Sequence, residues 1–160
     1  APQTYTLYAI KYVNKYHGSW LRTFDANIED AEGNAYVSNT YKDEINQKTP
    51  TVSITTVSLN KAQYAVDVRG TVCVLDLEFD GNENCTITTK SEGWTVSNAK
   101  GKFTSKGAVQ AWGEKDRDLL ELEYTIVHTS GAKSVNTKDY LVFQTNGVLM
   151  PDEFTATYKN

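Results

Sequence analysis

The sequence predicts an all-β fold, built as an antiparallel meander of about eight strands. The chain has 160 residues, of which 10 are Tyr, and Thr and Val are also frequent. These residue types suit a pleated, half-buried surface. Stretches in which apolar and polar residues alternate recur along the chain, separated by Gly, Asn, Asp and Ser. Because the length is typical of one folding unit, we predict a single domain over residues 1–160.

The predicted strands follow the alternation. In residues 71–79, apolar side chains occupy every second position, so that one face of this strand is buried. The predicted strands are residues 35–41, 51–58, 62–68, 71–79, 85–89, 93–104, 119–128 and 134–143. Residues 28–32 have some features of a short acidic helix. Residues 1–16, rich in Tyr, are interpreted as a lead-in strand or linker.

The connections between these strands indicate the topology. Short turn signals follow residues 58, 79, 90 and 128, and a connection this short joins antiparallel neighbours. Closing such a meander into a barrel removes its exposed edges, whereas a two-sheet sandwich keeps them. We predict the barrel, with a two-sheet β-sandwich as the alternative.

Charge and motifs argue against several function classes. A net charge of −4 without a run of Lys and Arg offers no surface for a polyanion, so we expect no nucleic-acid partner. No segment is apolar enough for insertion into a membrane. The two histidines, His17 and His128, are interpreted as structural, and no metal, phosphate-loop or nucleophile-elbow motif occurs. We therefore expect no metal, no cofactor and no enzymatic activity.

The two cysteines and one pair of carboxylates have structural interpretations. Hairpin pairing around residues 80–82 places Cys73 opposite about Lys90, too far from Cys85 for a disulfide. We therefore predict two buried free thiols. Asp76 and Glu78 share the polar face of one strand, which is expected to face solvent. A glycosidase needs one carboxyl group whose pKa is raised by apolar surroundings, so these two are not expected to form a glycosidase pair.

The strongest candidate for a binding site lies in residues 112–118. Trp112 can offer a flat ring to a sugar, while Asp116, Arg117 and Asp118 can bind its hydroxyl groups. The alternative is that these charged side chains satisfy the amides of a turn. Trp94 is either a second stacking platform or a core residue.

Nearly the whole chain resembles a known family. Residues 5–22 (YTLYAIKYVNKYHGSWLR) resemble the opening of the C-terminal module of Bacteroides-type cell-surface lipoproteins of uncharacterised function. The other similar segments are residues 101–107, 112–118, 122–125, 137–142, 147–148 and 153–154. The resemblance implies a protein associated with glycan-utilisation loci and exported to the outer-membrane surface or periplasm. Its lipid anchor would belong to a missing N-terminal segment, with residues 1–16 leading in from a missing N-terminal domain.

This resemblance implies glycan capture as the function. The expected role is a non-catalytic module that binds polysaccharide or oligosaccharide. One alternative is a structural spacer that docks a neighbouring domain or outer-membrane transporter components. The other is a carrier of a small ligand inside the barrel.

A second resemblance, to lipocalins, rests on Gly18-Ser19-Trp20, which is similar to the Gly-x-Trp of their first barrel strand. It implies a lipocalin-like or calycin-like barrel with Trp20 buried at one end. Lipocalins usually cover this Trp with an Arg from a late strand. Because no Arg follows Arg117, Lys133 or Lys138 would have to replace it.

Overall fold

The computed structural model describes residues 12–41 and 45–147, without the side chains of residues 36–41. Within these ranges it contains β-strands and no helix, as the sequence predicts. The strands are β1 (Gly18–Glu29), β2 (Ala35–Tyr41), β3 (Thr51–Ser58), β4 (Lys61–Val68), β5 (Thr71–Phe79), β6 (Asn84–Thr89), β7 (Trp94–Trp112), β8 (Lys115–His128) and β9 (Lys133–Thr145).

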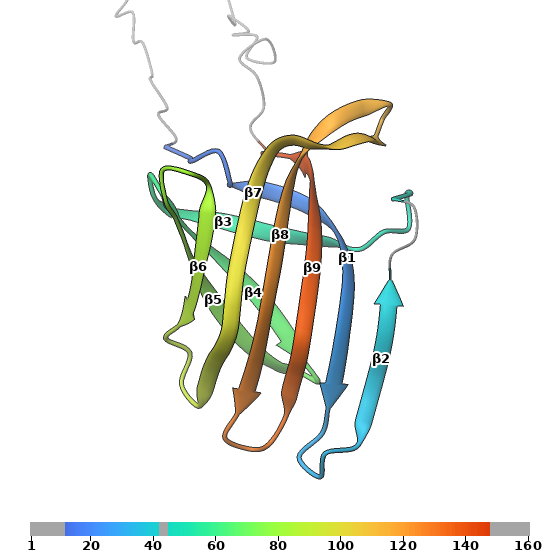
Figure 1. The fold of residues 1–160 in the computed structure, drawn as a ribbon, viewed down its shortest axis with the longest axis vertical. Helices are drawn as coiled ribbons and strands as arrows, with labels where there is room; N and C mark the ends of the chain where they lie inside the picture. The colour runs from blue at the N-terminus through green and yellow to red at the C-terminus, as the bar shows by residue number, and fades with distance from the viewer. Residues whose placement is uncertain (1–11, 42–44, 148–160) are drawn as a thin grey trace, which may run out of the picture.

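The strands form a closed antiparallel barrel (Figure 1). From β3 to β9, each strand pairs with the next one along the chain. β1 closes the barrel, because one of its edges pairs with β9 and the first part of its other edge pairs with β3. β2 stands outside this closed ring and pairs with the second half of β1, from Phe24 to Glu29. The predicted barrel is confirmed, and the sandwich alternative is wrong.

β1 is a strand that the alternation did not predict. Trp20 and Leu21 are neighbours that point to opposite faces, yet their exposed fractions are only 0% and 1%. Arg22 then places a charged group in the barrel interior, where it binds a buried carboxylate. Residues 28–32 are not helical, because they contain the end of β1 and a turn. Because both faces of this strand are buried and one inward-pointing residue is charged, its sequence does not alternate regularly between apolar and polar residues. The alternation therefore does not predict it.

Side chains fill the barrel interior. The largest fully buried ones are Trp20, Tyr64, Tyr124, Leu21, Ile54, Leu75, Leu77, Leu120, Leu122, Ile126, Leu141 and Val68. Cys73 and Cys85 lie in the same core as free thiols. Since the β5–β6 register pairs Phe79 with Cys85, Cys73 lies well away along the strand. The prediction of two buried free thiols is confirmed.

Trp20 lies at the end of the barrel where β1 begins. Its indole Nε1 donates to the carbonyl oxygen of Tyr16 at 3.0 Å, and its ring packs edge-on against Phe143, with centroids 5.3 Å apart. A Cβ on Gly18 would lie 2.4 Å from the carbonyl oxygen of Thr145, so only glycine fits at the start of this strand. The expected core position of Trp20 is confirmed.

The lysines expected above Trp20 lie elsewhere. Lys133 pairs with Glu29 at 2.7 Å, and Lys138 lies 4.0 Å from Glu123. The expectation that one of them replaces the lipocalin arginine is wrong. An aromatic contact with Phe143 takes that place.

Candidate functional site

A depression of about 630 Å³, lined by both polar and apolar atoms, lies on the outer face of strands β6–β9. Its outward-pointing side chains alternate with buried ones along each strand. The strand register aligns these outward-pointing side chains in two cross-strand rows. The rows are Lys102, Glu121 and Tyr140, and Lys100, Glu123 and Lys138.

Opposite charges alternate along the second row of the depression. Glu123 lies 3.1 Å from the ammonium of Lys100 and 4.0 Å from that of Lys138. Such exposed pairs contribute only about 0–1 kcal/mol each to stability. Glu121 is exposed and the Tyr140 ring is partly exposed. The depression therefore presents hydrogen-bond donors, hydrogen-bond acceptors and part of an aromatic ring. Its positive and negative side chains are mixed rather than all of one sign.

A buried polar network lies in the barrel interior behind this face. Asp139, whose side chain has no exposed area, accepts from Arg22 Nε at 2.9 Å and lies 2.8 Å from Arg22 Nη2. Its other oxygen accepts from the hydroxyls of Tyr64 at 3.1 Å and Tyr124 at 2.6 Å. These four residues belong to β1, β4, β8 and β9. The network therefore joins both sides of the barrel and holds β8 and β9, two of the strands that carry the depression.

This interior predicts a loss of stability at alkaline pH. Burial, assisted by the Asp139 carboxylate, raises the pKa of Tyr64 and Tyr124 well above the usual value of 10.0. Burial also raises the pKa of Cys85 from 9.0 to about 12. Since the unfolded chain releases these protons first, the free energy of unfolding should be unaffected below about pH 9 and should decrease above it. Urea unfolding followed from about pH 8 to about pH 11 measures this.

An unchanged urea midpoint across that range would contradict the expected alkaline loss. The matched variant is Tyr124→Phe, which removes one of the ionising hydroxyls. Its stability should be lower at neutral pH but should depend less steeply on pH, because one proton fewer is released on unfolding.

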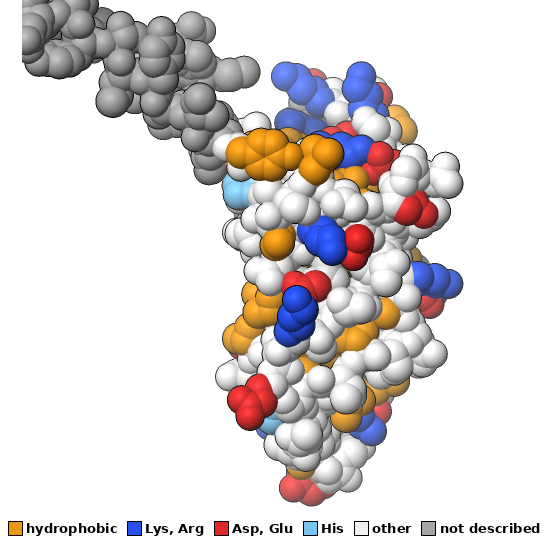
Figure 2. Space-filling view, turned by 90° about the vertical axis from the view of Figure 1, so that its left-hand side faces the viewer, with side chains coloured by type: hydrophobic (Ala, Val, Ile, Leu, Met, Phe, Trp, Pro, Cys, Tyr) orange, Lys and Arg blue, Asp and Glu red, His pale blue; other side chains and the backbone are white. Residues whose placement is uncertain are grey.

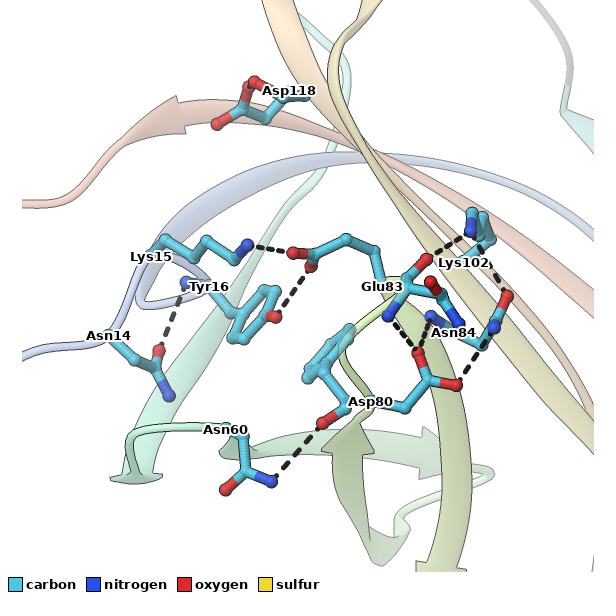
Figure 3. Close-up of polar contacts among 12 residues, drawn as sticks. Asn14, Lys15, Tyr16, Asn60, Asp80, Glu83, Asn84, Lys102 and Asp118 are labelled. Carbon is cyan, nitrogen blue, oxygen red and sulfur yellow. Dashed lines mark hydrogen bonds and ion pairs between the residues drawn. The ribbon is translucent and has the colours of Figure 1, made fainter.

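Residues 12–17, named the strap, lie across one end of the barrel. Tyr16 is 3% exposed, stacks on Phe79 with ring centroids 3.6 Å apart, and donates to Glu83 Oε2 at 2.8 Å (Figure 3). Lys15 pairs with the other oxygen of Glu83. Although burial opposes ionisation, the hydrogen bonds from Lys15 and Tyr16 lower the pKa of Glu83. The strap thus closes this end with a ring and an ion pair.

Residues 12–16 are the part of the predicted lead-in, residues 1–16, that can be compared with the structure. Residues 12–17 contain a turn and no strand, and residues 1–11 lie outside the described residues. Nearby, Lys102 of the depression donates to the carbonyl oxygen of Asn82 at 2.5 Å and to Asn84 Oδ1 at 3.2 Å (Figure 3). The turn that receives the strap therefore also borders the depression.

The binding segment predicted from the sequence lies on a hairpin arm, residues 105–118, which extends β7 and β8 beyond the barrel (Figure 1). Gly113, with φ of 62°, begins the two-residue turn at its tip. The ring of Trp112 is partly exposed. Arg117 Nε donates to the carbonyl oxygen of Trp112 at 3.1 Å. Trp112 and Arg117 therefore lie together, as the sequence suggests.

The two aspartates of this segment bind the backbone of the opposite strand. Asp118 accepts from the amide of Lys106 at 2.9 Å, and Asp116 accepts from the amide of Gln110 at 3.0 Å. Lys106 and Gln110 have φ values of 52° and 48° and lie where the β7–β8 register shifts. Each aspartate thus satisfies an amide that a β-bulge leaves unpaired. These contacts correspond to the structural alternative, and sugar binding by the arm stays a prediction.

The other sequence candidates occupy structural positions. Trp94 is 7% exposed and packs against the ring of His128 at 4.9 Å. Of its two interpretations, the structure favours the core one, because little of the ring is open to a ligand. His17 accepts from the amide of Thr56 at 3.2 Å, and His128 lies 2.8 Å from the hydroxyl of Ser130.

The carboxylates of β5 line a second depression, of about 540 Å³, on the outer face of β3–β6. Asp76 accepts from Gln63 at 2.8 Å, and Glu78 pairs with Lys61 at 3.1 Å. Figure 2 shows the barrel from the left-hand side of Figure 1, where positive and negative side chains are intermixed. Within residues 12–41 and 45–147, no group of three or more His, Cys, Asp and Glu could hold a metal ion. The same residues contain no helix able to span a membrane.

Two solved structures resemble this fold. A Bacteroides ovatus protein of unknown function is 31% identical in sequence, with a TM-score of 0.74, over 89% of this chain and 46% of that one. A multidomain Bacteroides ovatus protein that includes DUF1735 is 8% identical, with a TM-score of 0.50, over 80% of this chain and 50% of that one, a likeness of fold alone. This chain thus spans about half the length of either protein. No curated protein matches it.

The family assignment rests on most of the described structure. Residues 15–147 match a family described as a domain of unknown function, DUF5627. This range includes every strand of the barrel, the arm and the depression. Together with the Bacteroides ovatus structure, it supports the resemblance to an uncharacterised Bacteroides-type module. The chain therefore belongs to the DUF5627 family.

Proposed function

We propose that this domain is a non-catalytic carbohydrate-binding module whose site is the depression on the outer face of β6–β9. The observation that carries this proposal is the chemistry of the two cross-strand rows. They combine ammonium donors and carboxylate acceptors with the ring of Tyr140. Directed polar groups with an aromatic surface suit a ligand that has many hydroxyl groups and one apolar ring face.

The charge pattern favours an uncharged polysaccharide or oligosaccharide. Glu123 stands between two lysines, so neither sign dominates the second row. A uniformly anionic or cationic ligand would therefore meet repulsion at every second side chain. Hydroxyl groups accept from ammonium groups and donate to carboxylates, which lets one sugar chain satisfy both kinds of side chain.

The filled interior supports a surface site over an internal one. A carrier of lipocalin type needs an open apolar cavity inside its barrel, whereas Trp20, Tyr64 and Tyr124 are fully buried within this one. The network around Asp139 also ties together β8 and β9, two of the strands that form the depression. A rigid site loses less conformational entropy when a flexible sugar chain binds.

The cellular setting is part of the proposal. The parent protein would be exported and lipid-anchored at the outer-membrane surface or in the periplasm, where extracellular glycan and its transporter components are available. Support for this setting is the resemblance to Bacteroides-type surface lipoproteins, and the Bacteroides ovatus relative agrees with the bacterial group.

Affinity gel electrophoresis against a panel of neutral polysaccharides tests the site. The wild-type protein should be retarded by at least one of them. Tyr140→Ala should weaken that binding by about two- to tenfold, because an aromatic contact contributes about 0.5–1.5 kcal/mol. Trp112→Ala, which alters the arm but not the depression, is the matched control and should bind as the wild type does.

Three other outcomes would each overturn one part of the proposal. If Trp112→Ala abolishes binding and Tyr140→Ala does not, the site is the arm with Trp112, Asp116, Arg117 and Asp118. If no polysaccharide retards the wild type, the carbohydrate function is wrong. Release of reducing sugar from a retained polysaccharide would show that the domain is an enzyme.

A further inference from the structure

Exposed apolar side chains concentrate at the strap end of the barrel. Among the described residues, the exposed large hydrophobic side chains are Tyr12, Val57, Leu59, Val72 and Val109, with exposed fractions from 51% to 74%. Tyr12 belongs to the strap, Val57 and Leu59 to the end of β3 and its turn, and Val109 to the arm, all at one end (Figure 1). Only Val72 lies at the opposite end, at the start of β5.

Hydrogen bonds hold part of this surface in one shape. The Asn14 amide donates to Thr56 Oγ1 at 3.0 Å, and its side chain donates to the carbonyl oxygen of Ser58 at 2.8 Å. They bring the chain near Tyr12 against the segment that contains Val57 and Leu59. We name these three residues the strap patch. Because the strap is anchored, the patch is preformed and needs little ordering before it meets a partner.

The chain enters and leaves the barrel at this same end. Residue 12 belongs to the strap, and Thr145, near the last described residue, pairs with Ser19 at the start of β1 (Figure 1). A domain joined to either terminus would therefore be tethered beside the strap patch. A short tether gives the attached domain an effective concentration in the millimolar range, at which even a small interface forms.

The lengths of two similar proteins support one occupant for the strap patch. This chain matches 46% of one Bacteroides ovatus protein and 50% of another, which is described as multidomain. We propose that the strap patch is the docking surface for the remaining domain of a longer protein that contains this chain. Interfaces between domains of one chain are small and partly polar, and the strap that carries Tyr12 also carries the Lys15–Glu83 ion pair.

This interface is independent of carbohydrate binding. The depression is on the outer side of β6–β9, whereas the strap patch is at the barrel end near the β3–β4 turn (Figure 1). The strap patch and the depression share no residue. Failure of one proposal therefore leaves the other unaffected.

The buried native thiols allow a direct test by cysteine labelling. Cys73 and Cys85 are both buried, so Leu59→Cys introduces the one readily accessible thiol among the described residues. Maleimide should label Leu59→Cys rapidly in the 160-residue chain. In a longer protein that contains this chain and the proposed domain, labelling should be slower by about tenfold or more, because the tethered domain covers the site. Val72→Cys, at the opposite end, is the matched control and should react equally in both proteins.

Three results would overturn the interface. Equal labelling of Leu59→Cys in the short and long proteins would show that the patch stays open. Slow labelling in the short chain, together with a dimer in sedimentation, would assign the patch to a second copy. A natural protein no longer than this chain would remove the proposed partner.

Discussion

Asp139→Ala is expected to lower the free energy of unfolding by about 3–5 kcal/mol. The substitution leaves the largely buried guanidinium of Arg22 without its counter-charge and removes the acceptor of two tyrosine hydroxyls. A buried charge that loses its partner keeps its full desolvation cost, which is why one-sided removal is expensive. Urea unfolding at neutral pH, followed by tryptophan fluorescence, measures the change.

The control for Asp139→Ala is Glu123→Ala, which removes the exposed ion pairs of Glu123 with Lys100 and Lys138. That loss should be no more than about 1 kcal/mol. The double variant Arg22→Met with Asp139→Leu should recover much of the lost stability, because it removes both charges. If Asp139→Ala lowers the free energy of unfolding no more than Glu123→Ala does, the buried network around Asp139 does not stabilise the fold.

Trp20→Ala is expected to cost about 3–5 kcal/mol. The indole is fully buried and packs edge-on against Phe143, so its removal leaves a cavity that the closed barrel cannot collapse to fill. The variant also loses the hydrogen bond to the Tyr16 carbonyl. Hydrogen exchange of the strap should therefore accelerate along with the fall in the urea midpoint.

A tryptophan of the arm provides the comparison for Trp20→Ala. Trp112 is partly exposed on a hairpin that projects from the barrel, so Trp112→Ala should change stability by about 0.5 kcal/mol or less. Equal losses from both variants would mean that Trp20 does not anchor the core. Trp20→Phe should recover part of the packing but not the hydrogen bond, which separates the two contributions.

The strands that the sequence located well are those with one face buried and the other exposed. Residues 51–58 and 71–79 were predicted with the bounds that β3 and β5 have. The long hairpin of β7 and β8 was predicted too short only next to its turn, because the predicted strands were residues 93–104 and 119–128 whereas β7 ends at Trp112 and β8 begins at Lys115. Its bulges at Lys106 and Gln110 put residues other than glycine at positive φ and break the alternation. An aspartate of the opposite strand binds the amide at each bulge, so the residues next to the bulge do not by themselves predict it.

The candidate site was less accessible to sequence reasoning than the fold. Lys102, Glu121 and Tyr140 are separated by about twenty residues in the chain and become neighbours through the register of β7, β8 and β9. Asp139 is a carboxylate in a segment otherwise typical of a half-buried strand, and alternation by itself gives it no role. Its partner Arg22 lies 117 residues earlier, and pattern analysis does not pair residues so far apart.

Local order follows from the sequence because alternation, turn residues and composition each act over a few neighbouring residues. They were enough to indicate an acidic, Tyr-rich, antiparallel barrel with two free buried thiols. The sequence does not show which strands pair with β1, whether Trp94 is buried or which residues line the depression. All three depend on which strands meet when the barrel closes. Those pairings are stabilised by contacts between segments far apart in the chain, such as Arg22 with Asp139 and Trp20 with Phe143. They exist only once the barrel has closed.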